Sequence, residues 1–305
     1  MWTIEKKKSK RKWVIIQYEI NIKKSDFYIV KKRIIIYNRV VKKIEKEMHI
    51  YNTKAKQLVH KGGSMRAFAK SDIGKLRDMN QDSFFISNEQ DKVQLFIVAD
   101  GMGGYKGGEI ASKLAVETSR RYIVNNFDSI EHDKDSILSL IKSAIEYANL
   151  VVYEKAKEIP ELENMGTTID ICLVIPNKVY IGHVGDSRVY RKRKDFFRRL
   201  TTDHSYVQKL VSDGTITKEE AYNHPKKNML IKALGCSSYV EPDVTVKGFL
   251  KDDVLLMCSD GLTNMIKDNE IAEIISKNPV EACTNLVNKA NENGGLDNIT
   301  AVIIL

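Results

Sequence analysis

Two aspartates with the same surroundings are the first candidates for chemistry. Asp100 and Asp260 each follow a short apolar run and each precede a glycine, in VADGMGG and CSDGLTN. Such a run predicts a buried strand, so each carboxylate is expected at a strand end, where binding sites are commonly built. Asp-Gly is also ordinary turn chemistry, and for either residue alone that interpretation is equally good.

Three further aspartates stand in similar places. Asp297 precedes the final apolar stretch, Asp186 lies in a tight turn within HVGDSRVY, and Asp82 precedes the expected strand 83–87. Five carboxylates at one end of the sheets would raise one another's pKa unless a cation compensated their charge. Because the set contains no His or Cys, it favours Mg²⁺ or Mn²⁺ over zinc. The five residues together predict a divalent metal site.

An arginine near this set suggests what the site binds. Arg77 lies five residues before Asp82 in KLRDMNQD, and an arginine beside metal-binding carboxylates offers a planar fork to the oxygens of a phosphate. A plain surface arginine is an equally good interpretation. The glycine turn 101–108 contains no GxGxxG and is not followed by GK[ST], and no GxSxG occurs, so a dinucleotide site, a P-loop and a serine-nucleophile elbow are disfavoured.

The elements that must position these residues arrive in runs of strands and pairs of helices. Apolar periodicity predicts strands at 66–71, 83–87, 93–99, 168–175, 179–184, 188–192, 244–248, 254–258 and 299–305, and helices at 107–125, 135–157, 268–277 and 279–292. This order favours an α+β fold with helices packed on antiparallel sheets over alternating βαβ units. The three strands from 168 to 192 follow one another closely and are expected to be antiparallel neighbours. The polar stretch 205–220 lies within a predicted mobile flap at about 203–232.

Composition limits the class of protein. The chain has 305 residues, of which 43% are hydrophobic, so a sizeable core is expected. Its four cysteines show no CxxC spacing, which disfavours a zinc site and a disulfide framework and indicates a reducing, cytoplasmic location. No run of about 18 apolar residues occurs, so no membrane span is expected. The net charge of +9 is unevenly distributed: residues 1–64 hold 18 Lys and Arg against five Asp and Glu, or +13, and the remainder is −4. No nucleic-acid binding is therefore expected of residues 65–305.

Residues 1–64 lack the pattern of a folded domain. They alternate lysine clusters with short apolar runs, and no run is long enough for a signal peptide. One interpretation is a basic arm for a membrane or nucleic-acid surface. The other is a mis-assigned start, because Lys61 to Met65 could be encoded by a ribosome-binding site followed by a start codon. Mass spectrometry of the native protein decides between them, since any peptide from upstream of Met65 excludes the mis-assigned start.

From Met65 onward the sequence resembles a known family, the bacterial PP2C-type (PPM) metal-dependent protein serine/threonine phosphatases. Eight motifs carry the resemblance, in the family's order: SDIGKLRDMNQD (71–82), VADGMGGYKGGEIAS (98–112), MGTTI (165–169), GHVGDSRVYR (182–191), LTTDHS (200–205), HPKKNMLIKALG (224–235), LLMCSDGL (255–262) and DNITAVII (297–304). The resemblance implies a four-layer αββα sandwich over 65–305 and hydrolysis of phosphoserine and phosphothreonine in proteins.

The resemblance also implies roles for the metal-binding residues. The family's aspartate at the position of Asp100 bridges two ions, and the carbonyl at the position of Gly101 binds one of them. The aspartates matching Asp260 and Asp297 hold the other ion, and the one matching Asp82 acts through bound water. The two ions lower the pKa of a shared water, and the resulting hydroxide attacks phosphorus without a covalent enzyme intermediate.

Further residues follow from the same resemblance. The position of Asp186 helps hold a third, weaker ion near the flap, and Arg77 matches the phosphate-binding arginine. Met102 stands where eukaryotic members usually carry a histidine proposed as the general acid, so the residue that protonates the leaving group is unassigned. Gln81 and Lys232 depart from the common Glu and Arg. His183 and His204, although close to motifs, are expected to be structural.

The expected activity is therefore Mn²⁺- or Mg²⁺-dependent dephosphorylation of proteins by a cytoplasmic monomer, acting on the substrates of a cognate Ser/Thr kinase. Two other classes stay open. A hydrolase of small phosphoesters would use the same site. A non-catalytic phosphoprotein-binding module of the same fold would be expected to have lost a metal-binding aspartate, and none is missing.

Overall fold

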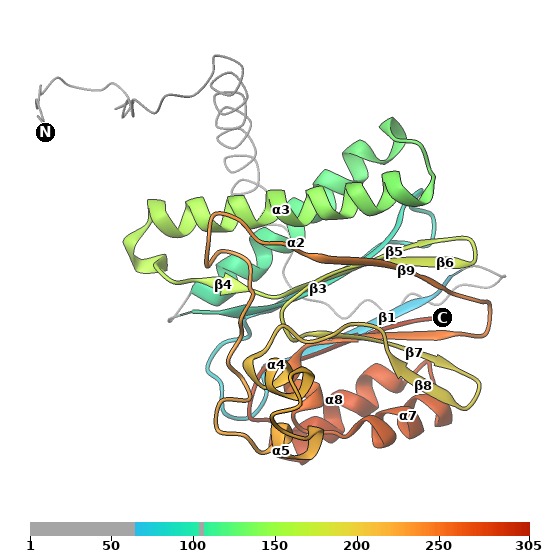
Figure 1. The fold of residues 1–305 in the computed structure, drawn as a ribbon. Coiled ribbons are helices and arrows are strands. Elements are labelled where there is room, and N and C mark those ends of the chain that lie inside the picture. The colour runs from blue at the N-terminus through green and yellow to red at the C-terminus, as the bar shows by residue number, and fades with distance from the viewer. Residues whose placement is uncertain (1–64, 104–106) are drawn as a thin grey trace, which may run out of the picture. The chain divides into compact units, whose positions relative to one another are not determined.

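The fold consists of two β-sheets packed face to face between two pairs of helices. The computed structural model describes residues 65–103 and 107–305, so the extension 1–64 and part of the glycine turn, 104–106, lie outside the described residues. Helices α2 and α3 cover the outer face of one sheet, and α7 and α8 cover the outer face of the other (Figure 1). The predicted α+β, four-layer αββα sandwich is confirmed.

Both sheets are antiparallel throughout. The first has the order β2-β3-β5-β6-β9, with the short β4 paired to the end of β3, and the second has the order β1-β11-β10-β7-β8. In the first sheet the strands are β2 (Asp82–Ile86), β3 (Gln94–Met102), β4 (Gly166–Thr167), β5 (Ile169–Ile175), β6 (Lys178–Val184) and β9 (Asp243–Gly248). In the second they are β1 (Ala67–Asp72), β7 (Arg188–Arg193), β8 (Phe196–Arg199), β10 (Val254–Cys258) and β11 (Ile299–Ile304).

Side-chain caps mark the starts of α3, α4 and α5. The Asp133 side chain accepts hydrogen bonds from the first turn of α3, and Thr217 forms a capping box with Glu220 at the start of α5. The helices are α2 (Gly107–Asn126), α3 (Lys134–Glu158), α4 (Tyr206–Ser212), α5 (Lys218–Tyr222), α6 (Asp260–Thr263), α7 (Asp268–Lys277) and α8 (Ala282–Glu292), with short 3₁₀ turns at Phe127–Ser129 and Pro160–Leu162.

Strand β10 shows how the layers are held together. Its side chains alternate, so that Leu255 and Met257 lie in the apolar cluster between the sheets while Leu256 and Cys258 lie in the cluster under α7 and α8. Both faces of the strand are therefore buried, which explains its uninterrupted apolar sequence. Its far end leads directly into Asp260.

One predicted pairing is wrong. Strands β5 and β6 are antiparallel neighbours, but β7 leaves their sheet and pairs with β10 and β8 in the other. The turn between β6 and β7 makes this crossing with Gly185 at φ +114°, in the left-handed region. A Cβ at Gly185 would lie 2.5 Å from a Thr168 methyl carbon, so the position requires glycine.

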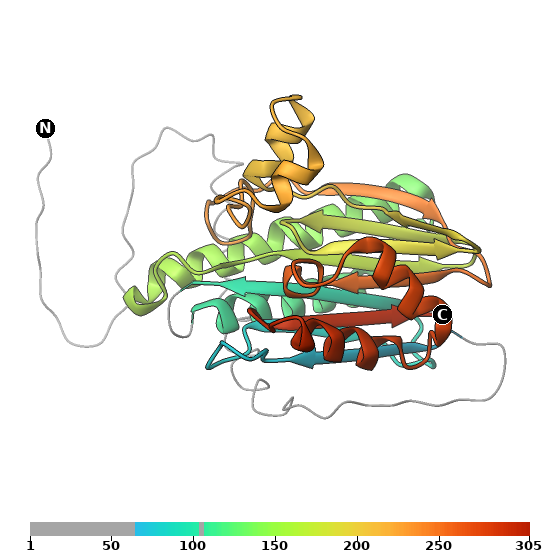
Figure 2. The same ribbon diagram turned by 90° about the horizontal axis from the view of Figure 1, so that it is seen from below.

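Helices α4 and α5 form the body of the flap. Figure 2 shows them projecting away from the sheets. Only Val207 of α4 is buried, and no residue of α5 is. The flap body therefore contributes little to the core.

The crossing turn yields a stability prediction. Gly185→Ala is expected to lower the free energy of unfolding by about 2 kcal/mol or more, because it combines backbone strain with the clash on Thr168. Gly214→Ala is the matched control: Gly214 also has a positive φ, of +72°, but open space surrounds it, so about 1 kcal/mol is expected. Urea unfolding measures both, and equal losses would contradict the packing role of Gly185.

Candidate functional site

The pairing of β2 with β3 brings the first two carboxylates together. Asp82 and Asp100 are direct cross-strand partners, so their side chains lie on the same face of the sheet. Asp82 Oδ2 accepts hydrogen bonds of 2.7 Å from both Ser259 and Thr300, which belong to the ends of β10 and β11 in the other sheet. Asp82 Oδ1 is buried without a hydrogen-bond partner. One carboxylate thus joins both sheets and keeps one oxygen unsatisfied.

Glycine is required immediately after Asp100. A Cβ at Gly101 would lie 2.1 Å from the carbonyl oxygen of Gly108, at the start of α2, and 2.6 Å from that of Gln81. The backbone of β3 therefore touches both α2 and the segment entering β2. Thr168 Oγ1 accepts a 2.9 Å hydrogen bond from the Asp100 amide, which fixes the Asp100 backbone from the side of β5.

The second sheet supplies Asp260 and Asp297. Asp260 is the first residue of α6, where it accepts a 2.9 Å hydrogen bond from Asn264 Nδ2 and shares a hydrogen bond with Asp100. Asp297 lies two residues before β11 and forms a 2.7 Å ion pair with Arg77 Nη2. The predicted arginine is therefore beside the predicted aspartates.

Asn298 was not singled out from the sequence, and it organises the loop that carries Arg77. Its side chain donates to the carbonyls of Ile73 and Met79 at 2.9 Å and accepts from the Gln81 amide at 2.8 Å. It is buried, so each of these bonds is shielded from water. Its only signal in the sequence is its position between Asp297 and the last strand.

The charges of the acidic cluster, which comprises the five aspartates 82, 100, 186, 260 and 297, act on one another. Burial raises the pKa of Asp100 well above its ordinary value, and the charges of the four other aspartates raise it further. Burial also raises the pKa of Asp82 to about 7, although its bonds from Thr300 and Ser259 oppose the shift. The structure therefore brings all five predicted carboxylates into one electrostatic unit.

The cluster fits hard cations by its chemistry, since all its side-chain donors are oxygen and one of them is buried without a partner. The side chains do not form a closed ligand set. Within residues 65–103 and 107–305, no group of three His, Cys, Asp or Glu side chains is arranged to hold a metal ion. Their present partners explain this, because Asp82 is turned to Ser259 and Thr300, and Asp297 to Arg77.

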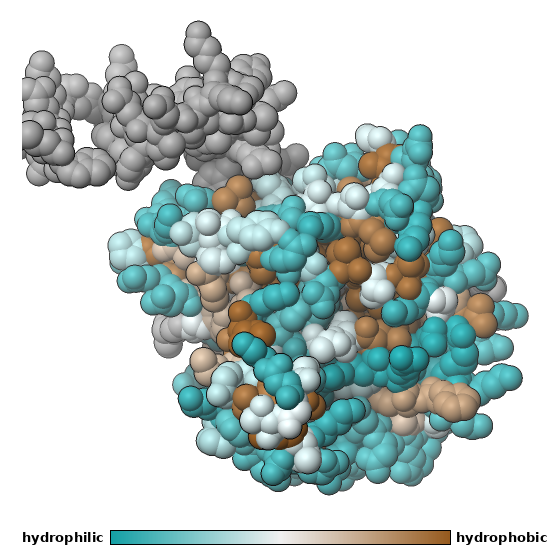
Figure 3. Space-filling view, in the orientation of Figure 1, coloured by the Kyte–Doolittle hydropathy of each residue, from teal (hydrophilic) through white to brown (hydrophobic). Residues whose placement is uncertain are grey.

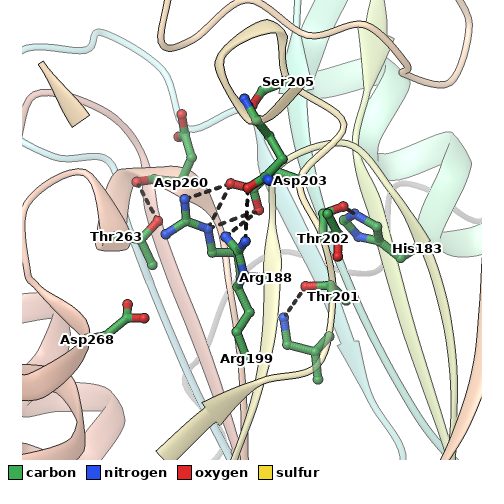
Figure 4. Close-up of polar contacts among 12 residues, drawn as sticks. His183, Arg188, Arg199, Thr201, Thr202, Asp203, Ser205, Asp260, Thr263 and Asp268 are labelled. Carbon is green, nitrogen blue, oxygen red and sulfur yellow. Dashed lines mark hydrogen bonds and ion pairs between the residues drawn. The ribbon is translucent and has the colours of Figure 1, made fainter. Parts of the chain in front are cut away.

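Asp203 anchors the start of the flap beside the cluster, and we call this point the flap root. Its carboxylate accepts from Arg188 Nε at 3.1 Å and Nη2 at 2.7 Å, and from Arg199 Nη1 at 3.1 Å. Figure 4 shows both guanidinium groups directed at Asp203, with Asp260 next to them. The positive charge of Arg188 lowers the pKa of Asp186 and Asp260 against the larger effect of burial. Sequence reasoning missed this unit of three side chains.

Two histidines lie behind the flap root in different hydrogen-bonding environments. His183 Nδ1 faces Asp170 Oδ1 at 2.7 Å, and Nε2 lies 2.9 Å from the Thr202 carbonyl, to which it donates. His204 Nδ1 accepts from the Gly185 amide, so its ring is neutral. Burial and the charge of His183 lower the pKa of His204 to about 4. The structural role expected for both histidines stays a prediction.

An αββα sandwich that gathers carboxylates and an arginine at one end has the architecture of the metal-dependent phosphatases. The chain belongs to the protein phosphatase 2C family, whose model matches residues 76–298.

Named relatives agree with this assignment. The serine/threonine phosphatase stp of Listeria innocua is 38% identical over 244 residues, which cover 79% of this chain and 95% of the relative. Stp1 from Staphylococcus aureus superposes with a TM-score of 0.72 at 33% identity, covering 83% of this chain and 98% of the other. The catalytic domain of PstP, solved in complex with two manganese ions, has a TM-score of 0.70 at 33% identity and covers 79% and 97%.

The buried His183–Asp170 pair yields a pH prediction. Burial lowers the pKa of His183, but the Asp170 charge and hydrogen bond outweigh it and the net pKa is raised. A raised folded-state pKa contributes stability below the unfolded value of about 6.5, which is lost as pH rises through the folded value. Asp170→Asn should shift the His183 titration to lower pH in ¹⁵N NMR, and the control Asp243→Asn, which contacts His204, should not. An unmoved His183 titration in Asp170→Asn would refute the pairing.

Proposed function

We propose that this chain is a Mn²⁺- or Mg²⁺-dependent phosphatase that hydrolyses phosphoserine and phosphothreonine in proteins. The observation that carries the proposal is the acidic cluster, which draws carboxylates from both sheets to one end of the sandwich and raises their pKa values by burial and mutual repulsion. Divalent cations would relieve this repulsion, and the manganese complex of PstP shows a related domain holding two such ions.

The residues divide into two groups around the ions. Asp100 and the Gly101 carbonyl would hold ions from the first sheet, and Asp82 would act through bound water. Asp260 and Asp297 would hold the second ion from the other sheet. When bound, the pair of ions supplies a water of lowered pKa as nucleophile and neutralises charge on the phosphoryl oxygens. Asp186, next to the flap root, would contribute to a third ion.

Arg77 would bind and orient the phosphate. Its side chain is 51% exposed and its Nη2 is already at the cluster, on Asp297. The fork geometry of a guanidinium matches two phosphate oxygens, which a lysine ammonium cannot do. Asn298 keeps Arg77 in place by bonding its loop on three sides.

The domain boundary, the location and the partners belong to the same proposal. We assign the catalytic domain to residues 65–305, and the relatives' coverage of 79% of the chain supports this boundary. A cytoplasmic location agrees with four free cysteines, three of them buried. No helix in the described part of the chain has the length and hydropathy of a membrane span. The expected partners are phosphoproteins and the kinase that modifies them, and the expected state is a monomer.

Phosphate release from a phosphothreonine peptide with Mn²⁺ tests the activity. Asp260→Asn should lower kcat/KM by more than about 100-fold, since the loss of partners one layer further out can already cost that much. Asp128→Asn, at an exposed surface pair with Lys92, should leave the rate unchanged. A chelator should abolish wild-type activity. Turnover that survives both the chelator and Asp260→Asn would overturn the metal mechanism. Cleavage of small phosphoesters alone would identify the protein as a hydrolase of small phosphoesters instead.

Arg77 offers a separate test of substrate binding. Arg77→Lys keeps the charge but loses the fork, so KM for the phosphopeptide should rise by about tenfold while kcat changes less. Inhibition by inorganic phosphate should weaken in parallel. If kcat falls and KM stays constant, Arg77 acts on the cluster through Asp297 and does not bind the substrate phosphate.

A further inference from the structure

The end of the sandwich opposite the acidic cluster carries an unusual surface made of three neighbouring turns. We call it the turn face and define it as residues 176–178, 191–198 and 247–252, which comprise the β5–β6, β7–β8 and β9–β10 turns and the strand residues next to them. Figures 1 and 2 show these turns at the same end of the sheets. Arg191 Nη1 and Arg193 Nη2 both donate to the Gly248 carbonyl, and Phe249 N donates to the Asn177 carbonyl. The three turns are therefore tied to one another.

Two large apolar side chains project from the turn face. Phe196 is 79% exposed and Leu250 is 49% exposed. One ion pair connects the two turns. Arg193, the cross-strand partner of Phe196, forms a bidentate ion pair with Asp253. Asp253 Oδ2 also accepts a hydrogen bond from the Leu250 amide. This ion pair therefore ties the turn that carries Phe196 to the turn that carries Leu250. Phe197, the next residue, turns inward and stacks on Tyr190, so the exposure of Phe196 follows from strand alternation.

The turn face is strongly basic although the domain is not. Its three segments hold eight Lys and Arg against two Asp, a local charge of +6, whereas residues 65–305 together carry −4. Asp253, which lies just outside these segments, forms an ion pair with Arg193. Among the described residues, no carboxylate pairs with Lys194, Arg198 or Lys247. Figure 3 shows a band of apolar surface set in hydrophilic surface where the β7–β8 hairpin lies.

We propose that the turn face docks on an anionic lipid bilayer, with Phe196 and Leu250 entering the headgroup region and the surrounding lysines and arginines contacting lipid phosphates. Two apolar tips on separate rigid turns, ringed by cations, suit a plane that is apolar inside and negative outside. A nucleic acid offers stacking to Phe196 but nothing to the aliphatic Leu250. A folded protein partner would require a wider continuous apolar area than two tips provide.

Docking in this way has a consequence for the site. Strands β6, β7 and β10 run from the turn face to the acidic cluster, so the bilayer would lie at one end of these strands and the cluster at the other. The acidic cluster, which an anionic surface would repel, then faces away from the lipid. The inference does not depend on the proposed activity.

Vesicle binding by the full chain tests the proposal. Vesicles of phosphatidylcholine and phosphatidylglycerol in equal parts should bind the protein, and pure phosphatidylcholine vesicles should not. Residues 1–64 carry +13 and can bind such vesicles by themselves, so the decisive readout is local: hydrogen exchange of 191–198 and 247–252 should slow on vesicle addition while that of α7 and α8 stays constant. Unchanged exchange in both segments would overturn the proposal.

Variants test the two components separately. Phe196→Ser with Leu250→Ser, and Lys194→Glu with Arg198→Glu, should each abolish this local protection. The controls are Val124→Ser on α2, which is 47% exposed, and Lys218→Glu on α5, and neither should change the local protection. Circular dichroism and thermal midpoints check that each variant is folded. Lipid docking would be contradicted if either double variant kept the slowed hydrogen exchange of the wild type in these segments. It would also be contradicted if a single-stranded oligonucleotide slowed the exchange equally in the absence of lipid.

Discussion

Mutual repulsion among five buried carboxylates is the constraint on which this end of the molecule depends. Asp100 is within the electrostatic reach of all four other aspartates, and burial acts on it in the same direction. The fold supplies partial compensation from its own groups: hydroxyls of Ser259 and Thr300 on Asp82, the amide of Asn264 on Asp260, and the guanidinium of Arg77 on Asp297. These contacts keep the carboxylates close together without cancelling their charge, which is the condition that favours a divalent cation.

The two-sheet architecture explains why the cluster can exist. A single strand end could present one or two carboxylates, but here β2 and β3 deliver a cross-strand pair while α6 and the start of β11 deliver Asp260 and Asp297 from the other sheet. The bonds of Asp82 to Ser259 and Thr300 cross between the sheets at this point. Packing of the two sheets against each other therefore also brings the carboxylates of the cluster together. The left-handed backbone of Gly185 lies where the chain crosses from one sheet to the other.

The sequence pattern around each residue was enough to predict the aspartates of the cluster. The five aspartates were found because each stands at an expected strand end or turn, and Arg77 because it lies close to Asp82. The resemblance to the family added the Gly101 carbonyl and assigned a role to each residue. Asn298 was missed because its partner Gln81 lies 217 residues away. Asp203 was missed because its pairing with Arg188 and Arg199 depends on the β7–β8 hairpin, which was not predicted. The crossing of β7 was missed because apolar alternation does not specify which sheet a strand joins. Strand β8 was missed because two of its four residues are arginines, which leaves no apolar run long enough to predict a strand.

The central claim is that carboxylates from both sheets hold one pair of divalent ions. Titration of the metal-free protein with Mn²⁺, followed by calorimetry for stoichiometry and by electron paramagnetic resonance for coupling between ions, tests it most directly. If the carboxylates of both sheets hold a pair of ions, at least two ions should bind per chain, and they should be magnetically coupled because they lie roughly 3.5–4 Å apart. Asp100→Asn should abolish the coupled signal. Binding of a single ion, or of uncoupled ions that Asp100→Asn leaves unaffected, would contradict it.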